Sequence, residues 1–220
     1  MLASALLVVS CASKAPRLCH TSGVCGDGEA CVVGQCVSSI APSPVAANAR
    51  RVVLEPESIA YVTSSGEGGA GARLSSVSLG ATVGDRARIL VKFPKSDWGK
   101  QTVTKAFLLL DRAEGAQAGP DEIVVRAASI VEPWSAKADA GTSWASPPNA
   151  VSIATGEARI SPRGSAPIRI EVTDYAIALG KKDARPWGLR IEAKGDGYGV
   201  PIATGFGAGT GPRLEVYLAP

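Results

Sequence analysis

The chain has 220 residues, with 23 Lys and Arg, 20 Asp and Glu, and a formal net charge of +3. That charge is too small and too evenly spread for a protein that binds nucleic acid mainly by neutralising phosphates. The only histidine, His20, lies in a cysteine-rich leader, which argues against most histidine-based catalysis. With 25 Gly and 15 Pro, the composition favours many turns over long helices.

The N-terminal residues have the pattern of an export signal. Residues 1–10 (MLASALLVVS) form an uncharged apolar run. It is too short for a mature transmembrane helix, but it fits the apolar core of a signal peptide. Residues 8–11 (VVSC) resemble the bacterial lipobox, which implies cleavage before Cys11 and acylation of its side chain and amino group. We therefore expect a signal peptide over 1–10 and a secreted, membrane-anchored lipoprotein of the cell envelope, in the outer membrane or at the periplasmic or cell surface. The alternative is an ordinary signal peptide with Cys11 as a bystander.

A short cysteine-rich module is expected over residues 11–37. Cys19, Cys25, Cys31 and Cys36 follow a C-x5-C-x5-C-x4-C pattern that does not suit a zinc site. In an oxidising compartment they predict two disulfides, with three possible pairings that the sequence does not rank. The stretch resembles the small cysteine modules that follow lipoboxes in myxobacterial surface proteins. It is interpreted as a protease-resistant spacer, with a small binding module as the alternative.

Residues 38–50 form a run rich in Pro, Ala and Ser, which predicts a semi-extended linker. The main domain is expected over 51–220, a length sufficient for one sizeable core. Its dominant signal is alternation of apolar and polar residues, which is typical of half-buried antiparallel strands. Strands are predicted at 88–93, 123–127, 168–172, 189–193 and 214–218, with a more apolar, central strand at 103–110.

One short helix is predicted at 174–181, with Asp174 as N-cap and Gly180 as C-cap. Several short strands separated by Gly- and Pro-rich turns indicate an all-β fold. We expect an antiparallel, jelly-roll-like β-sandwich with one short helix, preceded by a small disulfide-rich segment.

The order of the motifs resembles the DNRLRE family, a β-sandwich domain of bacterial secreted proteins related to carbohydrate-binding modules of disaggregatase type. The resemblance covers nearly the whole main domain. The matching segments are Ala60-Tyr61-Val62, 88–93, 103–110, the pair Trp134 and Trp144, 170–174, 188–191 and 212–216. It implies a carbohydrate-binding-module-like domain without catalytic activity.

Trp134, Trp144 and Tyr198 are the candidate ligand platform, because sugars stack on exposed aromatic rings. The alternative is that both tryptophans pin a long loop onto the rim of the sandwich. Lys181 and Lys182 belong to a short basic patch, interpreted as a solvated surface with anionic glycans or headgroups as a second interpretation.

Carboxylates gather only at Asp111 with Glu114 and at Asp121 with Glu122, where solvated turn residues are the simplest interpretation. We expect no catalytic residues, no metal site and no cofactor. The expected function is that of a non-catalytic binding protein, held at the membrane by its lipid, that recognises envelope or extracellular polysaccharide. The alternative is a structural, adhesion or scaffold lipoprotein that binds an envelope protein; nucleic acid is not an expected partner.

Overall fold

The computed structural model describes residues 29–32, 35–38, 48–65, 74–80, 86–113, 123–136, 142–151, 155–160, 167–182, 186–194, 199–205 and 210–220. The chain divides into two compact units, Met1–Ser43 and Pro44–Pro220, which are described separately. In the first, β1 (Glu29–Val32) and β2 (Gln35–Ser38) form an antiparallel hairpin in which Cys31 is the register partner of Cys36. The predicted lipidation site Cys11, and Cys19 and Cys25, lie outside the described residues.

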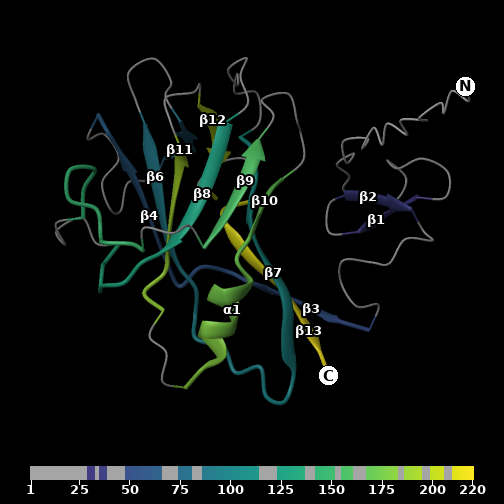
Figure 1. Cartoon of the computed structure of the whole chain (residues 1–220). Helices are drawn as coiled ribbons and strands as arrows, with labels where there is room; N and C mark the ends of the chain where they lie inside the picture. The colour runs from purple at the N-terminus through teal and green to yellow at the C-terminus, as the bar shows by residue number, and fades with distance from the viewer. Residues whose placement is uncertain are drawn as a thin grey trace, which may run out of the picture. The chain divides into compact units, whose positions relative to one another are not determined.

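The second unit consists mainly of two antiparallel sheets (Figure 1). One has the strand order β10-β7-β13-β3 and the other the order β4-β6-β11-β8-β9, and β12 pairs with β5 in a two-stranded ribbon. The strands are β3 (Arg50–Leu54), β4 (Ser58–Thr63), β5 (Ser76–Leu79), β6 (Ala87–Lys92), β7 (Thr102–Leu110), β8 (Ile123–Ser129), β9 (Gly156–Ile160), β10 (Ile168–Glu171), β11 (Leu189–Lys194), β12 (Val200–Ala203) and β13 (Arg213–Ala219).

The core lies between the inner faces of the two sheets, as the alternating pattern predicts. Leu108 of β7 and Val216 of β13 are fully buried, as are Ile89 of β6 and Ile191 of β11 in the other sheet. The expectation of an antiparallel β-sandwich with one short helix is confirmed. The segment 103–110 is an interior strand, as predicted, because β7 pairs with both β10 and β13.

The helix α1 (Thr173–Gly180) lies beside β7 at one end of the sandwich (Figure 1). Its predicted caps are wrong, by two positions at the N-terminal end and by one at the C-terminal end. Val172 is the N-cap, without a side-chain cap bond, and Asp174 lies in the first turn, while Lys181 rather than Gly180 is the C-cap. The hydroxyl of Thr173 is used elsewhere, because it accepts a hydrogen bond of 3.1 Å from the amide of Ala106 and so ties the helix start to β7.

Candidate ligand-binding site

The structure brings Trp134 and Trp144 together with a third tryptophan, Trp187. Trp134 and Trp144 belong to the segments that follow β8, and Trp187 precedes β11. All three are partly buried against a second apolar cluster on the outer face of the five-stranded sheet. We call Trp134, Trp144 and Trp187 the tryptophan cluster. The buried residues beneath it are Ala60, Val62, Leu90 and Ile130.

Polar contacts fix the cluster in place. The indole nitrogen of Trp134 donates a hydrogen bond of 2.6 Å to the carbonyl oxygen of Trp187. The guanidinium carbon of Arg88 lies 3.9 Å from the centroid of the Trp144 ring, and its Nη1 donates to the Trp144 carbonyl oxygen at 2.8 Å. One face of the Trp144 ring therefore carries a cation. Tyr198, the third member of the predicted platform, lies outside the described residues.

A pocket of about 320 Å³ lies beside Trp187. That volume is at the lower end of the range for small-molecule sites, about 300–1,000 Å³, and suits one sugar ring better than several. Its walls combine aromatic and aliphatic side chains with three charged ones. The lining residues are Glu57, Lys92, Phe93, Lys95, Leu179, Pro186 and Trp187.

Four segments distant in the sequence build the pocket: Glu57 comes from just before β4, and three others supply the rest of the lining. Of these three, the first follows the end of β6, the second is the last turn of α1, and the third leads into β11. Gly188 has φ of +129°, and a Cβ on it would lie 2.5 Å from the carbonyl oxygen of Val91. The glycine therefore lets Trp187 approach the end of β6 closely. The amide of Ser96 donates to the carbonyl of Leu179 at 3.3 Å and holds the end of α1 against the segment after β6.

The charged residues of the pocket differ in how their charge is compensated. Lys92 Nζ lies 3.2 Å from Glu57 Oε1, and both side chains are partly exposed. Lys95 donates from Nζ to the main-chain carbonyl oxygen of Lys182. Within the part of the chain that the structure describes, Lys95 has no carboxylate partner. The pocket therefore combines one neutralised cation with one that is not neutralised.

Tyr175 of α1 lies behind the pocket wall. It is 2% exposed, and its ring meets the ring of Phe93 edge-on, with centroids 6.4 Å apart. Its hydroxyl is buried close to the main chain of Phe93 but makes no hydrogen bond of normal geometry with the described residues. Burial raises the pKa of Tyr175 to about 12. The negative charge of Glu57 also raises this pKa, while the backbone of Phe93 lowers it. The phenol therefore stays protonated at neutral pH.

Glu192 of β11 supports the tryptophan cluster from below. Its carboxylate accepts hydrogen bonds from Arg88 at 3.0 Å, from Arg126 at 2.5 Å and from Arg190 at 3.4 Å. Burial raises the pKa of Glu192, but the three guanidinium groups outweigh that effect and hold it below its ordinary value. Because Arg88 also holds Trp144, the carboxylate is connected to the cluster through one side chain.

The other carboxylates singled out in the sequence do not gather into a site in the described part of the chain. Asp111 accepts two hydrogen bonds from Arg213, at 2.9 and 3.0 Å. Glu114, Asp121 and Glu122 lie outside the described residues. Among the residues that were placed, no group of three or more His, Cys, Asp or Glu side chains could hold a metal ion. Nor does any helix among them have the length and apolarity needed to cross a membrane.

The platform predicted from the sequence contains Trp134 and Trp144 but not Trp187, and the sequence did not single out Lys92, Lys95 or Phe93 as site residues. The sequence feature that indicated the position of the pocket was the basic patch, because its member Lys182 accepts a hydrogen bond from Lys95. Comparison with models of known protein families gave no match, and comparison with curated protein sequences gave no significant match.

Proposed function

We propose that this chain is an exported, lipid-anchored, non-catalytic binding protein, and that its β-sandwich recognises a polysaccharide of the envelope or the extracellular matrix. The observation that carries the proposal is the pocket lined by the partly buried ring of Trp187, next to the tryptophan cluster, where Phe93, only 1% exposed, completes the apolar lining. Sugar rings present C–H faces that pack on aromatic rings, while charged and polar groups at the rim fix their orientation.

The arrangement of the site favours binding over catalysis. Among the described residues, Glu57 is the one carboxylate that lines the pocket, and Lys92 neutralises it at 3.2 Å. A glycosidase of the usual kind needs two carboxyl groups facing each other across the scissile bond. Aromatic rings that are packed against a sheet and tied by a hydrogen bond, as Trp134 and Trp187 are, match the needs of a carbohydrate-binding module, because little ordering is needed when the ligand binds. The resemblance to the DNRLRE family supports the same proposal.

The test is a binding screen of the full chain against soluble and insoluble polysaccharides, read by retention and by tryptophan fluorescence. We expect saturable binding to one class of glycan. Trp187→Leu should weaken that binding about tenfold, equivalent to about 1.4 kcal/mol, because the leucine fills space but offers no ring. Phe107→Leu is the matched control, since Phe107 of β7 is a partly buried aromatic residue on the four-stranded sheet and does not line the pocket.

Parallel variants address the platform predicted from the sequence. Trp134→Leu and Trp144→Leu should weaken binding if those rings touch the ligand, and leave it intact if they only hold the loop. Retention on none of the glycans would overturn the proposal and favour a protein partner.

The lipid anchor has an independent test. Metabolic labelling with a palmitate analogue should label the wild-type chain, and Cys11→Ala should abolish the label. A variant that still carries the label would contradict acylation at this cysteine.

A further inference from the structure

The local charge of the pocket suggests which sugar it takes. Lys92 and Glu57 form an ion pair at the rim, so their opposite charges compensate each other. Lys95 is exposed, and the described part of the chain offers it only a carbonyl oxygen, that of Lys182. Lys181 and Lys182, both exposed, follow α1 directly and add positive charge on this side of the pocket. The nearest acid along the chain, Asp97, accepts the amide of Gly99 at 2.8 Å, and no ion pair joins it to Lys95 among the described residues.

The apolar part of the lining would strengthen an ion pair between Lys95 and a negatively charged ligand. Phe93, Leu179, Pro186 and Trp187 provide apolar walls around the charged rim. An ion pair beside such walls is screened less by water than one on an open surface. A sugar that stacks on Trp187 and carries a negative group at its edge would contact both the apolar walls and the positively charged rim.

Building on the proposed function, we propose that the ligand is an acidic polysaccharide, and that Lys95 is the residue that selects its negatively charged group. A uronic acid carboxylate and a sulfate ester share the chemistry that the lysine would recognise. Lys92 has a smaller part, because Glu57 already compensates its charge.

The experiment compares charged and neutral forms of the same glycan. Fluorescence titrations would use oligogalacturonate against its methyl ester, and dextran sulfate against dextran. We expect one charged probe to bind at least tenfold more tightly than its neutral counterpart in low salt, with the ratio falling as the salt concentration rises. Preference for oligogalacturonate would identify a carboxylate, and preference for dextran sulfate a sulfate.

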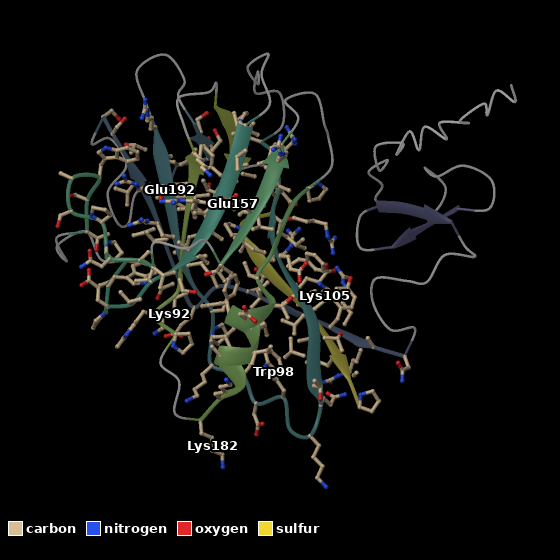
Figure 2. The ribbon with its side chains drawn as sticks, in the orientation of Figure 1. Lys92, Trp98, Lys105, Glu157, Lys182 and Glu192 are labelled. Carbon is tan, nitrogen blue, oxygen red and sulfur yellow. The ribbon has the colours of Figure 1, made fainter. Side chains whose placement is uncertain are left out.

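The variants locate the effect. Lys95→Gln should remove most of the preference for the charged form over the neutral form. Lys100→Gln is the matched control, because Lys100 is another exposed lysine of the segment between β6 and β7 and does not line the pocket. A second pair is Lys92→Gln and Lys105→Gln. Both are partly exposed strand lysines in an ion pair with one glutamate, on different sheets (Figure 2). Only Lys92→Gln should alter the preference, and by less than Lys95→Gln.

The outcomes separate this inference from the proposed function. Equal binding of charged and neutral forms would overturn the inference and leave the binding function standing. A preference that Lys95→Gln and Lys100→Gln reduce equally would also overturn it, since it would reflect overall charge. Failure of every probe, and of the wider glycan screen, would overturn the proposed function itself.

Discussion

Replacing Glu192 by glutamine should destabilise the domain and loosen the tryptophan cluster together. The carboxylate has a side-chain exposure of 13% and accepts from Arg88 at 3.0 Å and Arg126 at 2.5 Å, with Arg190 more distant at 3.4 Å. A hydrogen bond to a charged group is worth about 1.5–3 kcal/mol net, and breaking a buried ion pair costs about 3–5 kcal/mol. The glutamine keeps one acceptor oxygen but leaves three guanidinium groups without a counter-charge. The expected loss is about 2–4 kcal/mol, or a fall in Tm of about 5–15 °C for a domain of this size.

The assay is urea unfolding of the wild type and the variant at several pH values, with tryptophan emission recorded in the native state. The pKa of Glu192 is depressed in the folded chain, so its contribution is present above the ordinary value of 4.5 and is lost as the pH falls through the folded value. The difference between the two proteins should therefore be full at pH 7 and shrink in acid. Native emission should shift to the red, because Arg88 no longer holds Trp144 in place.

Glu157→Gln is the matched control, since Glu157 lies on the same sheet (Figure 2) but is 44% exposed and 4.0 Å from its one cationic partner in the described chain, Lys194. It should cost less than about 0.5 kcal/mol. If Glu192→Gln were as mild as Glu157→Gln, the reasoning about the arginine cluster would be refuted.

Two further predictions concern stability. Gly156→Ala should cost at least about 3 kcal/mol in urea unfolding, because a Cβ there would lie 1.9 Å from the main-chain oxygen of Glu171, where β9 meets β10; an unchanged midpoint would contradict this contact. Alkaline unfolding should begin above pH 10, because the pKa of Tyr175 is about 12 in the folded chain and 10 in the unfolded one; the stability it contributes is full below pH 10 and falls by about 2–3 kcal/mol as the pH rises to 12. Burial raises the pKa of Tyr61 as well, so Tyr175→Phe should reduce the alkaline loss of stability by the share of Tyr175 and leave the remainder; a profile as steep as that of the wild type would assign the transition to other groups.

The strands that the sequence revealed are those with strict alternation, because burial of one face leaves that pattern. The structure adds strands with weaker patterns. β12 (Val200–Ala203) contains Pro201, which lacks an amide proton and disfavours a central strand. β12 nevertheless forms a strand because it pairs with β5. The amide of Ala203 also has a partner, because it donates to the main-chain oxygen of Asp111 at 2.8 Å. That pairing depends on contacts remote in the sequence.

The alternating pattern also predicts outer faces that are more exposed to solvent than those in the structure. Glu215 points away from the core, as its place in the pattern predicts, yet it is only 1% exposed. Arg51 and Arg169, from the flanking parts of the same sheet, cover it with an ion pair on each carboxylate oxygen. The cover comes from strands β3 and β10, so a pattern read along β13 alone contains no sign of it.

The candidate pocket shows why local patterns did not reveal the site. Its lining residues come from before and after β6, from the end of α1 and from the entry to β11, and each segment alone has the composition of an ordinary loop or turn. A count of charged residues does not predict the local charge of the pocket either, because it treats Lys92 and Lys95 alike. Glu57 compensates the charge of Lys92, while the partner that the described residues offer Lys95 is a carbonyl oxygen, that of Lys182. The preference that we propose for an acidic ligand therefore rests on the charge of Lys95 at the pocket and not on the net charge of +3.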